Sequence, residues 1–460
     1  MSQLSHIAGS AWWLLVTLGL LVTFHEFGHY WVARRCGVKV LRFSVGFGRP
    51  LLRWQRQGSP TEFVIGAFPL GGYVRMLDER EAPVAAEDRH LAFNTQPLRA
   101  RAAIVAAGPL ANLLLAVLLY ATVNWSGVDE PKAVLASPVA GSIAQQAGLH
   151  GGELVLGAAL GEGDFEPVRS FEDLRWTLTR GALDGESVRL QFQPQRGSAQ
   201  RELVLPLNKL EVREADAHLF RRIGIVGPWT RPVLGELVAG GAAERAGLRA
   251  GDLVLRVGSG DVVDGSQLRE LIRTSGRGGQ PQALAWRVER DGRQLDLLVQ
   301  ADVVQEASGS VGRIGAYVGA APEMVNVRYG ATEGLWKGAE RTWEVSVLTL
   351  RMLGRMVIGE ASVKNLSGPL TIADYAGRSA SMGLTQYLAF LALISVSLGV
   401  LNLLPLPVLD GGHLMYYLWE ALTGRSVSDA WMERLQRGGV AVLLLMMSIA
   451  LFNDLTRLFG

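Results

Sequence analysis

The sequence predicts a polytopic α-helical membrane protein with four spans, cytoplasmic membrane-associated β-hairpins and a large extracytoplasmic segment of mixed α/β type. Three observations predict this class: apolar runs long enough to cross a bilayer, basic residues gathered after the first run, and an internal repeat between the second and third. Of the 460 residues, 49% are hydrophobic and 19% are charged, whereas soluble domains carry about 25% charged residues. The 45 basic and 43 acidic residues nearly balance, so we expect no nucleic-acid partner. The single cysteine, Cys36, excludes a disulfide framework.

The four predicted spans cover residues of about 10–33, 102–124, 384–409 and 434–455. Each run is close to the roughly 20 apolar residues that a spanning helix needs, and the lipid bilayer is therefore an expected partner. A cleaved signal peptide is the alternative for the first run. We reject it because no basic residue precedes the run and no small-residue cleavage site follows it.

Basic residues indicate the direction of the spans. Residues 1–33 contain no Lys or Arg, whereas residues 34–101 contain twelve. Short loops rich in Lys and Arg stay in the cytoplasm, so 34–101 is predicted to be cytoplasmic and the segment after the second span extracytoplasmic. Residues 1–127 and 384–460 then form the two membrane halves.

The first span contains the motif H-E-x-x-H at 25–29. Residues four apart share one face of a helix, so His25 and His29 can bind one zinc ion while Glu26, beside them, serves as general base. The alternative is a pair of buried histidines satisfied by packing. Ionisable residues inside a span are costly and mark functional sites, which favours the metal site.

Asp410 is the candidate third ligand. It follows Pro405 and Pro407, which end the third span, and precedes two glycines. The first and third spans both run inward, so the topology places Asp410 and H-E-x-x-H at a similar depth near the cytoplasmic face. A simple helix exit with a turn is the alternative for this segment, and His413 is a rival ligand.

These motifs together resemble the site-2 protease family of intramembrane zinc metalloproteases. H-E-F-G-H stands in the first span, and N-x-x-P-x-P-x-L-D-G starts at Asn402 in a later one. Further family-like segments are G-F-G at 46–48, P-L-G-G-Y-V at 69–74 and G-P-L-A-N at 108–112. The resemblance implies that His25, His29 and Asp410 hold one Zn²⁺ per chain and that Glu26 is the catalytic base. It also implies substrate contacts for Asn402 and for Gly46, Phe47 and Gly48, the last three in a re-entrant hairpin.

The cytoplasmic loop 34–101 contains three strand-like runs separated by glycines, at 40–45, 62–68 and 73–76. We expect hairpins with an exposed edge that holds an extended substrate by strand addition. A small sheet without a catalytic part is the alternative. Asn112 in the second span is expected to bond across helices, although ordinary span packing explains it equally well.

The extracytoplasmic segment contains an internal repeat. Residues 144–156 and 243–255 are identical at eight of thirteen positions, at an offset of 99. The pattern resembles PDZ domains of the bacterial protease-associated type, which implies two such domains at 128–222 and 223–312. Their second helices are expected at 171–179 and 266–273. Residues 223–226 are expected to form a peptide-binding loop or an ordinary strand.

A connector at 313–383 precedes the third span. Its residues 335–358 form an amphipathic pattern, which predicts a helix lying on the outer membrane surface or a cap on the PDZ pair. The whole order resembles the regulator of sigma-E type within the family. That implies a bacterial inner-membrane enzyme with periplasmic PDZ domains. Its implied substrates are single-span membrane proteins such as a trimmed anti-sigma factor, with remnant signal peptides as a second class. An inactive PDZ-bearing scaffold and a proton-relay transporter are the rival interpretations.

Overall fold

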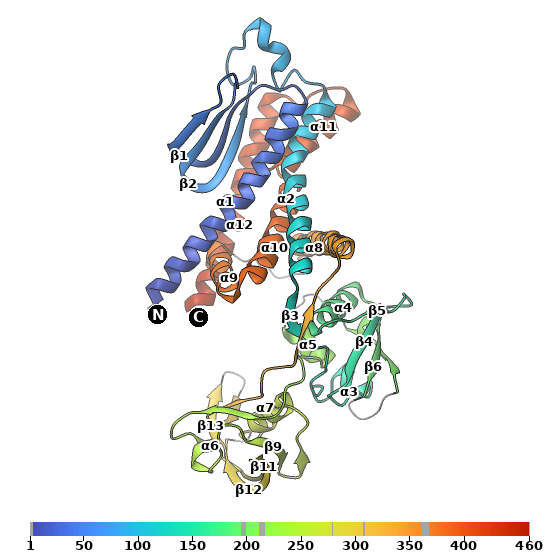
Figure 1. Ribbon diagram of the computed structural model, residues 1–460. Helices are drawn as coiled ribbons and strands as arrows, with labels where there is room; N and C mark the ends of the chain where they lie inside the picture. Colours follow the sequence, from blue (N-terminus) through green and yellow to red (C-terminus); the bar gives the residue numbers. More distant parts are fainter. Residues whose placement is uncertain are drawn as a thin grey trace. The chain divides into compact units, whose positions relative to one another are not determined.

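The computed structural model describes residues 3–194, 199–210, 217–277, 279–306, 309–359 and 368–459. It consists of two compact units (Figure 1). Unit 1 joins Met1–Val128 to Arg328–Gly460, and unit 2 is Asp129–Val327. Some predicted segments include residues that are not described. In the predicted domain 128–222 these are 195–198 and 211–216, in the predicted domain 223–312 they are 278 and 307–308, and in the connector they are 360–367.

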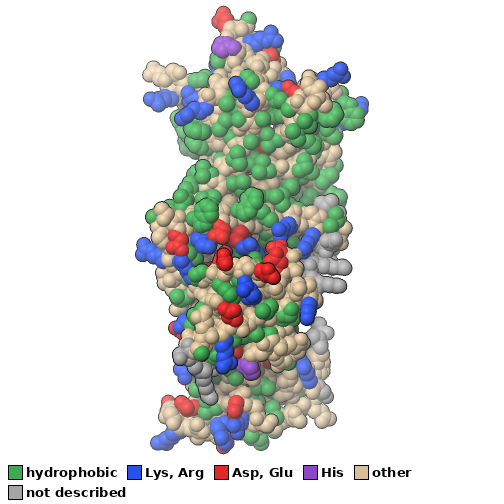
Figure 2. All heavy atoms as spheres, turned by 90° about the vertical axis from the view of Figure 1, so that its right-hand side faces the viewer, with side chains coloured by type: hydrophobic (Ala, Val, Ile, Leu, Met, Phe, Trp, Pro, Cys, Tyr) green, Lys and Arg blue, Asp and Glu red, His purple; other side chains and the backbone are tan. Residues whose placement is uncertain are grey.

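Four helices of unit 1 are long and apolar enough to cross a membrane. They are α1 (Gln3–Arg35), α2 (Leu98–Ser126), α10 (Leu384–Asn402) and α12 (Asp429–Phe459). Leu21, Leu115 and Leu391 bring α1, α2 and α10 together in one buried cluster. Figure 2 shows hydrophobic side chains forming a broad band over the spanning helices on that face. The chain is therefore a multi-pass membrane protein.

The third span ends earlier than predicted. The expected run was 384–409, but α10 stops at Asn402, a turn follows, and α11 (Asp410–Thr423) begins a new helix. Pro405 and Pro407 lie in the turn. They lack an N–H group and disfavour helical geometry in the residue before them, so the apolar run continues after the helix has ended.

The loop at 34–101 folds into one sheet from two long, bent strands, β1 (Val40–Gln55) and β2 (Glu62–Met76). The first part of β1 pairs on both sides: Val45 faces Gly72 on one side and Ile65 on the other. The second part of β1 pairs only with the start of β2, as Leu52 does with Ile65. The 72–76 segment of β2 is consequently an edge, and β2 packs against α1. A short 3-10 helix, η1 (Ala86–Leu91), precedes α2.

The predicted amphipathic helix is present as α8 (Ala331–Val357). It belongs to unit 1 and packs on α2, where a Cβ atom at Gly338 would lie 2.8 Å from the Val117 carbonyl oxygen. Trp336 and Trp343 point outward and are more than 70% exposed. A further helix, α9 (Pro369–Met382), went unpredicted; the buried carboxylate of Asp454 on α12 accepts hydrogen bonds from its first backbone N–H groups.

Unit 2 contains two similar α/β modules. The first has a sheet ordered β5-β4-β6-β7 and the second a sheet ordered β10-β9-β11-β12. The first module comprises α3 (Ile143–Gln146), β4 (Leu154–Leu160), β5 (Glu166–Pro167), α4 (Phe171–Asp184), β6 (Val188–Gln193) and β7 (Arg201–Leu205). The second comprises α6 (Ala242–Arg245), β9 (Leu253–Val257), β10 (Gly260–Asp261), α7 (Gly265–Thr274), β11 (Ala283–Arg290) and β12 (Arg293–Gln300). Both predicted second helices, now α4 and α7, are confirmed.

The repeated acidic residue has the same structural task in both modules. Glu153 accepts hydrogen bonds from the backbone N–H groups of His150 and Gly151. Its counterpart Asp252 accepts one from Arg249 and is also bound by the Arg290 guanidinium. Because buried N–H groups need acceptors, this carboxylate explains why the turn before β4 and β9 keeps the same pattern.

A second correspondence extends the second module beyond its predicted end at 312. The sequence R-I-G occurs at 222–224 and again at 313–315, with φ of +98° at Gly224 and +67° at Gly315. Residues 224–226 form no strand, because α5 (Ala217–Ile223) ends directly before them. The remaining strands are β3 (Val128–Pro131), β8 (Leu234–Leu237), β13 (Asp302–Glu306), β14 (Gly309–Arg313), β15 (Ala316–Val318) and β16 (Met324–Val327). Since β15 pairs with β8 and β16 with β3, the unit continues to Val327.

Candidate metal centre

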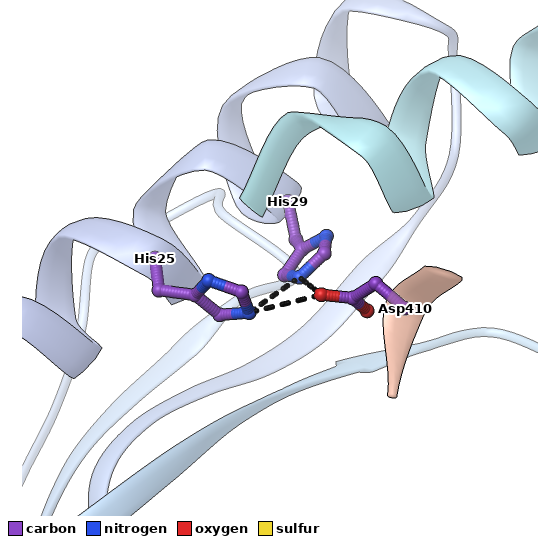
Figure 3. A group of neighbouring side chains, drawn as sticks. All are labelled: His25, His29 and Asp410. Atoms are coloured by element: carbon purple, nitrogen blue, oxygen red, sulfur yellow. Dashed lines mark hydrogen bonds and ion pairs between the residues drawn. The ribbon is translucent and has the colours of Figure 1, made fainter. Parts of the chain in front are cut away.

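Three side chains from two distant parts of the chain meet in unit 1 (Figure 3). His25 Nε2 lies 3.2 Å from His29 Nε2 and 3.1 Å from Asp410 Oδ2, and His29 Nε2 lies 3.6 Å from the same oxygen. These three residues form a group whose ligand atoms could hold one metal ion. His413, the rival ligand, is not part of this group.

Local sequence explains how the three ligands converge. His25 and His29 are one turn apart on α1, so their rings project from the same face. Asp410 is the first residue of α11, directly after the turn that contains the two prolines. A Cβ atom at Gly411 would collide with the Leu404 carbonyl, and one at Gly412 would lie 2.6 Å from Pro407 Cα. The two glycines therefore let the turn fold back tightly against the start of α11.

The donor set fits zinc. Zinc takes histidine nitrogens at about 2.0–2.1 Å and carboxylate oxygens at about 2.0–2.2 Å in tetrahedral sites. Two ligand atoms of such a tetrahedron are then about 3.3 Å apart, and the three observed separations lie on either side of that value. Two imidazoles with one carboxylate form a donor set that catalytic zinc sites use, and it leaves a fourth position open.

Glu26 lies between the two histidines in sequence and faces the sheet. A Cβ atom at Gly72 would lie only 3.0 Å from Glu26 Cγ. The backbone N–H of Val74 donates a hydrogen bond to the Glu26 carboxylate. Gly72 and Val74 belong to the free edge of β2. The candidate base therefore lies directly beside an unpaired strand edge.

The second span contributes contacts that the sequence analysis missed. His29 Nδ1 is 2.8 Å from the Ile104 carbonyl oxygen on α2. A Cβ atom at Gly108 would overlap His29 Nε2 and would lie 2.8 Å from His25 Cε1. The only sequence signal was the G-P-L-A-N segment, which ordinary helix packing explained equally well. On α2, Arg101 also pairs at 2.6 Å with Glu420 of α11, which fixes the helix that begins with Asp410.

The other predicted site residues belong to the same unit, and among the described residues they are not part of the group that could hold a metal ion. Asn402 is the last residue of α10. Gly46 and Gly48 have φ of +86° and +88° at the bend of β1, and Phe47 between them stacks on Tyr73. Gly46 follows Val45, the partner of Gly72, so this strip is one strand away from Glu26.

The fold and the site together define a multi-pass membrane metalloprotease. Residues 13–446 match the profile of peptidase family M50, and the chain belongs to this family. It is 43% identical over 458 residues to a Ralstonia nicotianae protein named as a zinc metalloprotease, covering 96% of this chain and 97% of the relative. It is 38% identical over 459 residues to regulator of sigma-E protease RseP of Escherichia coli and 40% identical over 461 residues to protease RseP of Yersinia pestis. In both cases the match covers 96% of this chain and 98% of the relative.

Proposed function

We propose that this protein is an intramembrane zinc endopeptidase in which His25, His29 and Asp410 hold one Zn²⁺ and Glu26 is the catalytic base. The observation that carries the proposal is the convergence of three ligand atoms, from α1 and α11, at separations of 3.1–3.6 Å. Membership of a peptidase family supports a hydrolytic use of this centre.

The residues of this chain divide the chemistry between them. A bound zinc ion supplies Lewis-acid polarisation and makes a water molecule more acidic. Glu26 takes a proton from the attacking water and passes it to the amine that leaves when the peptide bond breaks. A substrate segment must be extended for attack, since a helical peptide bond is shielded by its own hydrogen bonds. The free 72–76 edge of β2, beside Glu26, offers that conformation by strand addition.

The proposed substrates are single-span membrane proteins of the anti-sigma factor type, cut near the cytoplasmic face of the bacterial inner membrane. Several relatives carry the name regulator of sigma-E protease, which supports this class of substrate. Large exposed apolar side chains on β1 support membrane association of the sheet: Leu51, Leu52 and Trp54 are 67%, 61% and 54% exposed. Gly46, Phe47, Gly48 and Asn402 are proposed to contact the substrate.

We further propose that the two modules of unit 2 are periplasmic PDZ domains. Their repeated sheet-and-helix order and the paired R-I-G turns support this. In that fold, a strand edge beside the second helix binds a peptide. The proposed role is a size filter that excludes substrates with bulky ectodomains; capture of a new C-terminus is the competing role.

The test compares the wild type with Glu26→Gln in detergent or liposomes, using a single-span substrate labelled at both ends. Glu26→Gln should retain zinc and lose cleavage, because it keeps the shape of the side chain but not the base. Mass spectrometry should place the wild-type cut near the cytoplasmic end of the substrate helix. Cleavage by Glu26→Gln at the wild-type rate contradicts the base assignment.

A further inference from the structure

The second span fixes the ring of His29 through its backbone. His29 Nδ1 lies 2.8 Å from the carbonyl oxygen of Ile104. A carbonyl oxygen can only accept a hydrogen bond, so His29 Nδ1 must carry the proton. Its Nε2, which faces Asp410 at 3.6 Å, then keeps a lone pair for a metal ion.

His25 has the same requirement but a different partner. Its Nε2 faces Asp410 Oδ2 at 3.1 Å, so metal binding through Nε2 requires a proton on Nδ1. The structure brings the side-chain amide of Asn112, also on α2, to 3.4 Å from that Nδ1. The amide nitrogen is the atom placed there, and the amide oxygen is buried without a hydrogen-bond partner. An N–H group facing a second N–H group cannot form a hydrogen bond.

Rotating the Asn112 amide by half a turn resolves this arrangement. The two ends of an amide have the same shape and are assigned from their partners. With the oxygen toward His25, Nδ1–H donates and Oδ1 accepts. We propose that Asn112 is a positioning residue of the metal centre, which accepts a hydrogen bond from His25 Nδ1 and so holds the His25 ring ready to bind metal through Nε2.

The surroundings of Asn112 support this role over generic packing. The residue is 1% exposed, and a buried polar side chain without a partner is costly. Its tie to α10 uses the backbone: Ser395 Oγ donates to the Asn112 carbonyl oxygen at 2.7 Å. Helix packing at this point therefore does not need the side-chain amide, which remains available for His25.

This inference rests on the proposed zinc site, and its test measures metal binding without any cleavage assay. Full-length wild type, Asn112→Leu, Asn112→Asp and Ser395→Ala are purified, stripped and titrated with zinc against a chromogenic chelator. Asn112→Leu should weaken zinc binding by about 10–100-fold, the usual effect of losing a group that orients a ligand. Asn112→Asp keeps an acceptor and loses the donor, so it should bind zinc close to the wild-type level. Ser395→Ala removes only the helix contact and should leave the affinity unchanged.

Cobalt gives a second readout that a packing role would not move. The Co²⁺ absorption spectrum should match the wild type in Asn112→Asp and shift in Asn112→Leu. Wild-type affinity in Asn112→Leu overturns the inference, and so does Asn112→Asp that binds as weakly as Asn112→Leu. If Asn112→Leu fails to fold, Asn112→Ala, which also removes the acceptor, takes its place and is compared with Asn112→Asp on the same criterion. Failure of the wild type itself to bind zinc contradicts the proposed function instead.

Discussion

Gly108 on α2 lies so close to His29 on α1 that no side chain fits between them. A Cβ atom at position 108 would overlap His29 Nε2 and would lie 2.6 Å from His29 Cε1. Close helix approach through small residues is common in membranes, but here the space is taken by a histidine of the candidate metal centre. The glycine therefore belongs to the site as much as the ligands do.

Gly108→Ala is expected to displace His29 and lower zinc affinity by about 100-fold, the upper end of effects from groups that orient a ligand. Alanine favours helix over glycine by about 1 kcal/mol, so a weakened α2 would not explain the loss. Chelator competition on the purified protein measures the affinity. Gly19→Ala on α1 is the matched control, because a Cβ atom there meets nothing within 4 Å. Equal zinc affinity in the two variants would contradict the close contact.

Excising unit 2 should change which substrates are cleaved. The cut belongs at 129–327 with a short Gly-Ser linker, because the backbone N–H of Tyr329 donates to the Asn124 carbonyl and so holds the two remaining ends side by side. Under the filter role, the excised chain cleaves a substrate with an intact ectodomain that the full chain spares.

The same excision carrying Glu26→Gln is the control, since it should cleave nothing. Loss of cleavage of the trimmed substrate would favour capture of a C-terminus instead. If the excision alters neither rate, both roles are refuted.

Asp252 should make the second module sensitive to acid. Burial acts to raise the pKa of this carboxyl, but the Arg290 guanidinium and the Arg249 backbone N–H that bind it outweigh burial and lower the pKa below its usual value. A lowered folded-state pKa gives stability that is present above the unfolded pKa of about 3.9 and is lost as pH falls through the folded value.

Asp252→Asn should therefore lower the melting temperature of unit 2 at pH 7, by an amount corresponding to about 1–3 kcal/mol for a lost charged hydrogen bond. The difference from the wild type should shrink as the pH drops below 4. Asp296→Asn is the control, because Asp296 binds Arg287 in a similar way on the exposed surface, where such pairs contribute little. A melting difference for Asp252→Asn that stays constant from pH 7 to pH 3 would contradict the linkage.

Features that repeat at short range could be predicted from the sequence. The spans are apolar runs, His25 and His29 are one helical turn apart, and the prolines before Asp410 predict a helix break. These patterns also led to the metal-site hypothesis, because topology alone brings the first and third spans to the same depth.

Contacts between distant segments could not be predicted in this way. Nothing at position 108 or 112 indicates that α2 packs against the histidines rather than against another helix. The early end of α10 could not be predicted from hydrophobicity, because residues 403–409 remain largely apolar after the helix has ended. The edge of β2 beside Glu26 depends on the bend in β1, which lets the first part of β1 pair with β2 on both sides. Strand periodicity does not reveal such a bend.

The zinc content of purified variants tests the central claim most directly. Elemental mass spectrometry of the wild type, Asp410→Ala and His413→Ala, each prepared in parallel, separates the assigned ligand from its rival three residues later. The account predicts one zinc per chain in the wild type and in His413→Ala, and a content well below one in Asp410→Ala. A full zinc content in Asp410→Ala, or its loss in His413→Ala, would contradict the assignment of the metal centre.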